Sequence, residues 1–565
     1  MSFYDDASLI MYPSGYKEDK IYSLKPTDGS GDLTFTRAST ATRVNAEGLI
    51  ETSPVNLLQQ SNTFNVTWAS AGSGATTVIG QTDPDGGSNA WLLTKLGQTG
   101  RIEQTLNVGG VQTFFIYAKK NTSDFIQITI FDGIAAHECW FNLSTGVVGT
   151  QNSATGAIES VGGGWYKCSI TSTNNIASGV IQIYQSEANG VVSGTTGAIS
   201  IFKAQINIGS TAKPYFPTTD RLNVPRIDYT GDLCGKLLLE KQSTNVLLSS
   251  EDWTTNWSGS NRLVTANDII SPYGTQNADK LSAIGGGSYY AQVRTSASGS
   301  NTFSVFLKYG DKTTQSIYAY SSGSYFAQAA FNLQTGTISS TISGTAKIED
   351  YGNGWYRCIV SGTAGSSTIE IGIEGIAIGA FSYAWGAQLE AGSYATSYIP
   401  TLASSVTRLA DAAFKTGISS LIGQTQGVLF IDFVWNQLTG TGAYPRIIEA
   451  WNNSSNYIQL FNVAGTSTVY YEISNGGAIQ FSGNTTMNLG RNKLALAYKL
   501  NDCVFYKNGS LIASDTSATI PTTNDLGICG TYDGTAGAQL SASVNQAIVF
   551  PTRLTNTQLA TLTTI

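Results

Sequence analysis

The sequence FNLSTG at residues 141–146 returns as FNLQTG at residues 331–336, and GWYKC at 164–168 returns as GWYRC at 354–358. Both pairs are 190 residues apart. Three earlier matches keep the same order at an offset of 189: residues 56–58 with 245–247, Trp68 with Trp257, and residues 117–119 with 306–308. Ordered matches at one offset predict two copies of a single module.

Within the copies, apolar and polar residues alternate over short runs such as 303–308 (FSVFLK) and 368–374 (TIEIGIE). A period of two predicts half-buried strands, and Gly-rich turn clusters separate the runs. No long segment shows a helical period. The pattern predicts an all-β protein with tandem antiparallel jelly-roll sandwiches. The strand-like runs after residue 425 differ in texture and contain an Asn508-Gly509 hairpin signal, so we expect a second sandwich type there.

Proline-containing tails close each copy at KPYFPT (213–218) and SYIPT (397–401), and a short lead-in resembling a strand pair precedes each copy. These signals predict the domain boundaries. We expect an attachment segment at 1–50, a first jelly roll at 51–217, a lead-in at 218–240, a second jelly roll at 241–401, a linker at 402–425 and a terminal sandwich at 426–565.

Composition excludes several functional classes. Charged residues make up 12% of the chain, and the net charge of −7 includes no basic run, so we expect neither nucleic acid nor anionic lipid as a partner. No apolar stretch of about 18 residues is present, and the start lacks a signal-peptide pattern, which predicts no membrane span and no secretion by that route. The six cysteines show no zinc-ligand spacing, and reduced thiols are favoured over a Cys503–Cys529 disulfide.

No candidate catalytic group withstands comparison of the two copies. Glu370 and Glu374 share one strand face but stand about 13 Å apart along it, too far for a glycosidase pair. His137 and Cys139 share another face with no evident third group, and the second copy has neither. We therefore expect no catalytic residues and no enzymatic activity.

Candidate binding residues are few. Asp83 and Asp85 could offer carboxylates to a structural Ca²⁺, although a plain turn is favoured because the second copy has no acid there. Trp165 and Trp355 recur in both copies and are expected in the core. Because flat aromatic faces stack on sugar rings, aromatic residues outside the shared pattern are the better ligand candidates: Tyr318, Tyr320, Tyr325, Trp451 and Tyr457.

Three stretches resemble bacteriophage structural proteins of the tail, head-fibre or receptor-binding type: LTFTRASTATR at 33–43, GWYRC at 354–358 and WGAQLEAGSY at 385–394. The opening YDDASLIMYP at 4–13 is similar to the start of such proteins in phages of gut bacteria, including crAss-like phages. The first copy departs from this pattern, because FKAQIN at 202–207 replaces WGAQLE at 385–390.

The resemblance implies carbohydrate-binding-module-like jelly rolls, a terminal concanavalin A-like (laminin-G-like) domain and no cofactor. It further implies a homotrimeric appendage on the virion surface, synthesised in the bacterial cytoplasm. Residues 1–50 would contact other virion proteins, and the distal sandwiches would adhere to a host-cell glycan or protein receptor. The alternatives are a polysaccharide depolymerase and a decoration protein with only a structural role. Recognition residues are expected where the two copies differ, or in the unrepeated terminal domain.

Overall fold

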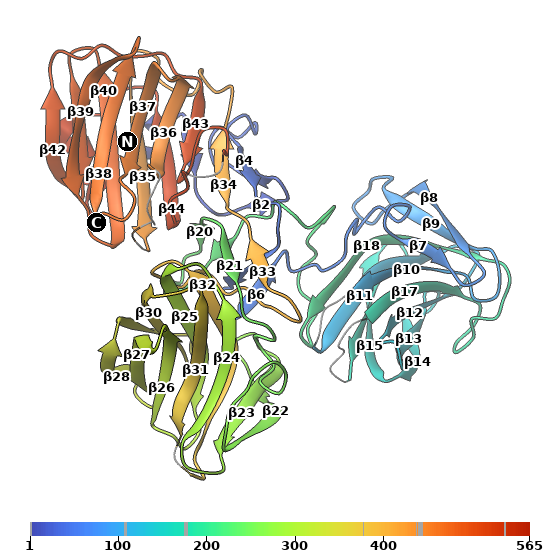
Figure 1. The fold of residues 1–565 in the computed structure, drawn as a ribbon. Helices are drawn as coiled ribbons and strands as arrows, with labels where there is room; N and C mark the ends of the chain where they lie inside the picture. Colours follow the sequence, from blue (N-terminus) through green and yellow to red (C-terminus); the bar gives the residue numbers. More distant parts are fainter. Residues whose placement is uncertain are drawn as a thin grey trace. The chain divides into compact units, whose positions relative to one another are not determined.

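The protein is described from a computed structural model covering residues 3–106, 110–173, 179–376, 378–436, 438, 444–535 and 538–565. The fold is all-β, as predicted: antiparallel sheets form three β-sandwiches (Figure 1). Short helices lie at the two ends of the described chain, α1 (Phe3–Asp6) and α2 (Asn556–Thr563). No helix among the described residues is long and apolar enough to cross a membrane.

The first jelly roll is built from two six-stranded sheets, in the orders β14-β13-β12-β17-β10-β7 and β15-β16-β11-β18-β9-β8. Their inward side chains, including Ile116, Ile128 and Cys168, form one core with no solvent exposure at these positions. The strands are β7 (Ala69–Ala71), β8 (Ala75–Gln81), β9 (Ala90–Lys95), β10 (Arg101–Leu106), β11 (Gln112–Lys120), β12 (Phe125–Phe131), β13 (Ala136–Asn142), β14 (Val147–Asn152), β15 (Ala154–Gly162), β16 (Trp165–Ser172), β17 (Gly179–Ser186) and β18 (Ala198–Ile208).

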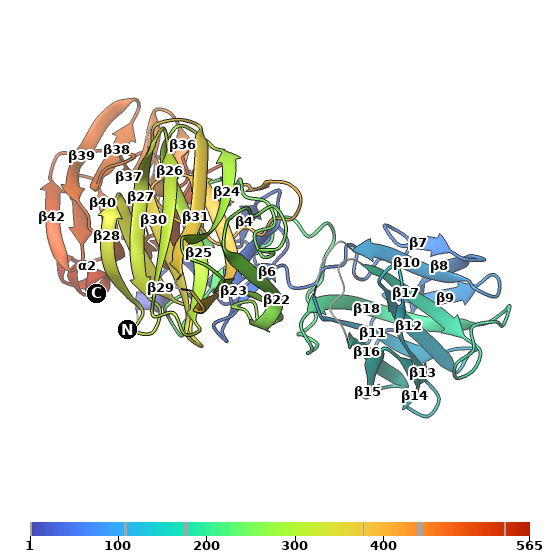
Figure 2. The same cartoon turned by 60° about the horizontal axis from the view of Figure 1, so that its bottom comes forward.

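The second jelly roll repeats this topology with orders β22-β23-β32-β25-β30-β29 and β24-β31-β26-β27-β28, except that its second sheet has five strands and no counterpart of β7 (Figure 2). The duplication predicted from sequence is thereby a duplication of fold. Its strands are β22 (Arg262–Ile270), β23 (Gln276–Ala283), β24 (Ser288–Thr295), β25 (Gly299–Tyr309), β26 (Thr314–Ser321), β27 (Ser324–Asn332), β28 (Thr337–Ser343), β29 (Thr345–Asp350), β30 (Trp355–Ala364), β31 (Thr368–Ile376) and β32 (Phe381–Ala391).

The repeated FNLxTG motif forms a turn for a local physical reason. The Asn142 side-chain oxygen accepts hydrogen bonds from the backbone amides of the two following turn residues, Ser144 and Thr145, at 2.9 and 3.0 Å. Gly146 has φ +70°, and the Tyr166 ring lies so close that a Cβ there would come within 2.7 Å of it. Asn332 makes the same two bonds in the second copy. The recurrence of this motif thus reflects turn geometry.

The start of each copy is tied to its proline-containing tail by a buried serine. The Ser61 hydroxyl accepts a hydrogen bond from the Thr218 amide at 2.9 Å, and Ser250 accepts the equivalent bond from Thr401 at 2.8 Å. Both serines are fully buried. The two tails therefore belong to the scaffold of the jelly rolls.

The terminal sandwich has one sheet in the order β19-β20-β44-β35-β40-β41-β42, with β1 also on β44, and another in the order β2-β3-β4-β34-β43-β36-β37-β38-β39. The strands are β1 (Leu9–Met11), β2 (Tyr16–Lys17), β3 (Lys20–Ile21), β4 (Leu33–Thr36), β19 (Ile227–Asp228), β20 (Lys236–Leu239), β34 (Ala412–Lys415), β35 (Gln426–Trp435), β36 (Arg446–Asn453), β37 (Asn456–Asn462), β38 (Thr468–Asn475), β39 (Ala478–Thr486), β40 (Gly490–Lys499), β41 (Cys503–Lys507), β42 (Ser510–Asp515), β43 (Asp525–Ile528) and β44 (Ala542–Phe550).

Residues 1–50 were expected to form a separate segment, but the structure places their strands in the terminal sandwich. β1 pairs with β44 and β4 pairs with β34, so these residues complete both sheets of the terminal sandwich (Figure 1). Leu9, Met11, Leu33 and Phe35 are fully buried in its core. The physical reason is that a strand lacking local partners satisfies its backbone by pairing with distant strands. The role of this segment in virion attachment stays a prediction.

The first jelly roll is an insertion in chain order. Residues 54–221, grouped with 274–276, form one compact unit, and the remaining residues form the other. Within the larger unit, the Ser53 hydroxyl donates to the Pro225 carbonyl at 3.2 Å, beside the β5 (Ala41–Val44) and β6 (Ile50–Ser53) hairpin. The chain therefore leaves this unit and returns to it at neighbouring points.

Removing residues 54–221 and joining Ser53 to Leu222 through about four Gly/Ser residues should give a folded protein. The linker need only span about 10 Å, because Leu222 lies three residues before Pro225. In calorimetry, the transition temperature of the retained unit should differ by no more than a few degrees between the shortened protein and the full-length protein. Loss of that cooperative transition would contradict the insertion.

Three buried arginines join the segments of the larger unit. Arg37 Nη1 donates to Asp411 Oδ1 at 2.7 Å, while Arg226 contacts Asp411 and donates to Glu240 at 2.8 Å. Arg408 lies 3.5 Å from Glu240 and belongs to β33 (Val406–Arg408), which pairs with β21 (Ser243–Asn245). All three arginines are at most 1% exposed. No local pattern in the sequence predicts this cluster, because Arg37 and Asp411 are 374 residues apart.

Candidate functional site

The terminal sandwich carries a row of stacked aromatic rings on one sheet. Trp451 of β36 and Tyr457 of β37 are direct cross-strand partners, and their ring centroids lie 5.3 Å apart with planes inclined by 11°. Tyr532, in the loop after β43, stacks on the other side of Trp451 at 5.0 Å and 7°. All three rings are half-buried. We call Tyr457, Trp451 and Tyr532 the aromatic row.

The aromatic row contains two residues that the sequence singled out, Trp451 and Tyr457, and the structure brings them together. Tyr532 was missed, because it lies in a loop 75 residues beyond Tyr457 and nothing in its local pattern marks it. A second stack continues along the same sheet, where Phe461 and Tyr470 lie 5.2 Å apart at 12°.

Polar side chains accompany the row. The Tyr457 hydroxyl donates to Glu472 at 2.5 Å, and Gln459 donates to the same carboxylate at 3.3 Å. Burial, together with this bond to Glu472, raises the pKa of Tyr457 to about 12. Arg446 Nε donates to Glu449 at 3.0 Å and its guanidinium lies over the Phe461 ring. The sheet thus presents half-buried rings beside paired polar groups.

This geometry defines where a ligand could stack. β36 lies between β43 and β37 in the sheet, so the two tyrosines reach Trp451 from opposite neighbours, and the outer faces of Tyr457 and Tyr532 form the ends of the row. An aromatic face beside hydrogen-bonding side chains suits a ligand with an apolar face and polar rim, such as a sugar ring.

The carboxylates near the row are engaged. Glu449 is 1% exposed, one oxygen accepts from the Tyr532 amide at 2.6 Å, and the other accepts from Arg446. Burial raises the pKa of Glu449, which alone would suit a general acid. A general acid must also donate its proton to the leaving-group oxygen, and both oxygens of Glu449 are already engaged by protein donors.

The second jelly roll brings Tyr318, Tyr320 and Tyr325 together as a smaller patch. The Tyr325 ring meets the other two edge-on, each at 5.3 Å. Tyr318 is only 3% exposed, because its ring lies over Gly372 and its hydroxyl donates to Glu370 at 2.7 Å. Tyr325, at 44% exposure, is the accessible member.

Two other predicted positions have structural explanations. Asp83 accepts hydrogen bonds from the backbone amides of Asp85, Gly87 and Asn89 at 2.9–3.0 Å, and these bonds lower its pKa, with that from Asn89 the largest cause. Asp85 pairs with Lys203 at 2.5 Å. Among the described residues, no group of three or more His, Cys, Asp or Glu side chains could hold a metal ion.

The His137 and Cys139 pair shows no nucleophile geometry. The His137 ring lies between the Ser153 carbonyl at 2.7 Å and Asp132 at 3.2 Å. Cys139 is fully buried, and burial raises the pKa of its thiol to about 12. A thiol at this pKa stays protonated at neutral pH, so it cannot act as a nucleophile. All six cysteines are free, as favoured from the sequence, although Cys234 is exposed.

No protein-family model and no curated protein matches the chain. Among solved structures, the CBM40 domain of a Ruminococcus gnavus IT-sialidase bound to α2,3-sialyllactose matches at 19% identity and a TM-score of 0.23, covering 26% of this chain and 91% of that one. The leech intramolecular trans-sialidase matches at 16% and 0.22, covering 25% and 24%. A botulinum neurotoxin type C structure matches at 13% and 0.22, covering 27% and 39%.

Proposed function

We propose that this chain is a non-enzymatic glycan-binding adhesin, and that it serves as an appendage protein of a bacteriophage virion. The observation that carries glycan binding is the aromatic row, which places half-buried rings beside Arg446, Glu472 and Gln459 on one sheet. The phage assignment rests on the sequence resemblance at residues 33–43, 354–358 and 385–394. In that setting the protein is a homotrimer on the virion surface and contacts host-cell glycans or a protein receptor.

Weak sites suffice for such an adhesin. Three copies of one row on a trimer, and several trimers on a particle, raise the effective concentration of each site after the first has bound. Millimolar single-site affinity then supports stable attachment. This explains how a surface with few free hydrogen-bonding groups can still adhere.

The test is binding of full-length protein to immobilised host capsular polysaccharide and to a glycan array, with Tyr532→Ala as the central variant. Removing this ring deletes the flat tyrosine face at one end of the row, so we expect the single-site Kd to rise about 10-fold or more. Tyr532→Phe keeps the ring and should bind like the parent protein.

Tyr309→Ala is the matched control, because Tyr309 is a 36% exposed tyrosine of the second jelly roll outside both aromatic patches. It should leave binding unchanged. Equal binding by Tyr532→Ala and the parent protein would exclude the row as the glycan site. New reducing ends in the polysaccharide after incubation would instead establish a depolymerase, and failure of the full chain to bind any host glycan would favour a decoration protein.

A further inference from the structure

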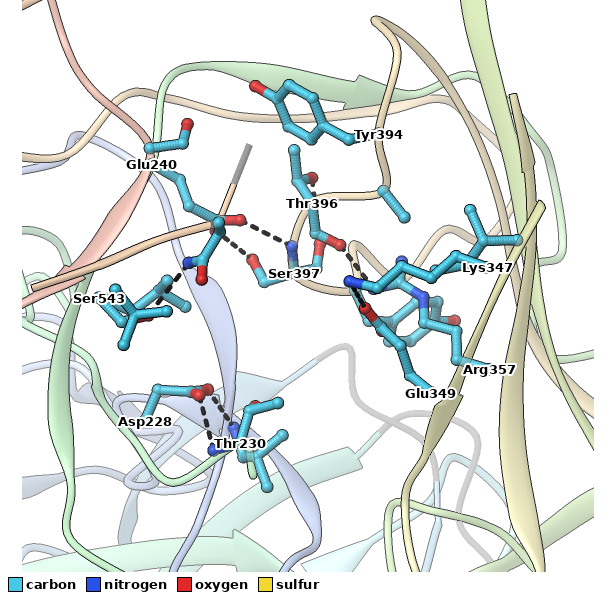
Figure 3. Close-up of a pocket in the computed structure, with 18 of the residues that line it drawn as sticks. Asp228, Thr230, Glu240, Lys347, Glu349, Arg357, Tyr394, Thr396, Ser397 and Ser543 are labelled. Atoms are coloured by element: carbon cyan, nitrogen blue, oxygen red, sulfur yellow. Dashed lines mark hydrogen bonds and ion pairs between the residues drawn. The ribbon is translucent and has the colours of Figure 1, made fainter. Parts of the chain in front are cut away.

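A cavity of about 540 Å³ lies within the larger unit (Figure 3). It is lined by the lead-in strands through Thr42 and Asp228, by the second jelly roll through Arg357, by the loop at 393–398 and by the terminal sandwich through Ser543. This volume lies in the range of small-molecule pockets. Its walls come from four parts of the chain that the sequence does not place together.

Arg357 supplies an unusual charge on this wall. It is 2% exposed, Nη1 donates to the Thr396 carbonyl at 2.7 Å, and Nη2 donates to the Ser304 hydroxyl at 3.0 Å. Its guanidinium lies over the Phe306 ring at 5.4 Å, and within the described ranges its Nε has no hydrogen-bond partner. Among the described residues it forms no ion pair, although a buried guanidinium normally has a carboxylate partner.

The other charged groups of the lining are accounted for, with one exception. Five of them take part in ion pairs within the larger unit: Arg43 with Glu51, Lys236 with Asp232, Lys347 and Glu349 with each other, and Glu240 with Arg226. The exception is Asp228, which accepts the Val44 and Thr230 amides at 2.8 and 2.9 Å and forms no ion pair in the part of the chain that the structure describes. Figure 3 shows Asp228 and Arg357 on different sides of the cavity.

We infer that the cavity binds an acidic sugar, with its carboxylate at Arg357 and its ring hydroxyls at Asp228. The planar guanidinium matches a carboxylate in shape and charge. An ionised aspartate is a pure acceptor, so it takes hydrogen bonds from sugar hydroxyls. Ser393 and Thr345 add exposed hydroxyl-bearing side chains to the rim. This site is separate from the aromatic row and does not depend on it.

Titration calorimetry of full-length protein with three probes tests the inference. Glucuronate and glucose differ only in the carboxylate at C6, and acetate carries the carboxylate without the ring. We expect glucuronate to bind about 10-fold or more tightly than glucose, as for a hydrogen bond to a charged group, and more tightly than acetate. Equal binding of glucuronate and glucose would overturn the role of Arg357, and equal binding of glucuronate and acetate would overturn the sugar assignment.

Variants locate the site. Arg357→Gln should remove the preference for glucuronate, whereas Arg294→Gln, in the same jelly roll but outside the cavity, should keep it. Should Arg357→Gln fail to fold, Ser393→Trp on the exposed rim fills the entrance without altering a buried side chain, and it should weaken glucuronate binding. Unchanged binding in Ser393→Trp would overturn the cavity as the site. Tyr532→Ala should leave glucuronate binding intact, which separates this result from that of the aromatic row.

Discussion

Residues 402–565 expressed alone should not fold, although they contain most strands of the terminal sandwich. The fragment lacks β1 and β4, whose side chains Leu9, Met11, Leu33 and Phe35 are fully buried in its core. Burying four such side chains is worth about 6–12 kcal/mol, which is comparable to the whole stability of a typical domain. We expect an unfolded or aggregated fragment, measured by circular dichroism and size-exclusion chromatography.

The matched control is the protein in which residues 54–221 are replaced by a short linker. It also lacks the first jelly roll, but it retains β1 to β4 together with β19 and β20. This protein should be folded under the same conditions. A cooperative thermal transition for residues 402–565 alone would show that the N-terminal strands are dispensable.

Asp411→Ala should be the most destabilising single substitution among those considered. Asp411 is fully buried between Arg37 and Arg226, and its removal takes away the carboxylate that both arginines contact. Of the cluster's two carboxylates, Glu240 then remains for three buried arginines. Breaking a buried ion pair on one side costs about 3–5 kcal/mol. Urea unfolding of the larger unit should show this loss as a lower midpoint with an unchanged slope.

Asp502→Asn is the comparison, because Asp502 is 47% exposed and pairs with Arg553 at 2.8 Å on the surface. The Asp502→Asn substitution should cost less than about 1 kcal/mol. Equal urea midpoints for the Asp411→Ala and Asp502→Asn variants would contradict the cluster's role in stability.

The arginine cluster also predicts an acid limit to stability. Burial alone would raise the pKa of Glu240, but Arg408 and Arg226 outweigh it and lower the pKa from 4.5 to about 2. The stability that Glu240 contributes is present above about pH 4.5 and is lost as the pH falls toward 2.

The repeated scaffold could be predicted because its causes are local. The alternation along residues 303–308 places Phe303, Val305 and Leu307 in the sandwich core. The opposite face of this strand is buried as well, at Ser304 and Phe306, so the strand is not half-buried as its pattern predicts. Trp165 and Trp355 lie in the interior at 2% exposure, as expected from their recurrence. Turn chemistry at Asn142 involves residues within three positions, and Gly146 meets Tyr166, which lies twenty residues further along in the other sheet of the same sandwich. Such features need no knowledge of distant segments.

The remaining features depend on long-range contacts. Leu9 pairs with Val549, and Arg37 meets Asp411, so neither the strand nor the ion pair leaves a local signature. At the candidate site, the proximity of Trp451 and Tyr457 follows from a hairpin, whereas Tyr532 arrives from a separate loop. Tyr318 was expected to be available, but Gly372 on the adjacent strand leaves room for its ring to lie flat and become buried.

The entry and exit of the first jelly roll at neighbouring points has an evolutionary consequence. Recombination that exchanges residues 54–221 for another β-sandwich leaves every strand of the recipient unit, and every member of its arginine cluster, unchanged. Such an exchange can therefore replace this module while the sandwich that contains both ends of the described chain is inherited intact. The lineage would show rapid divergence in the inserted domain and slow divergence in the sandwich that carries it.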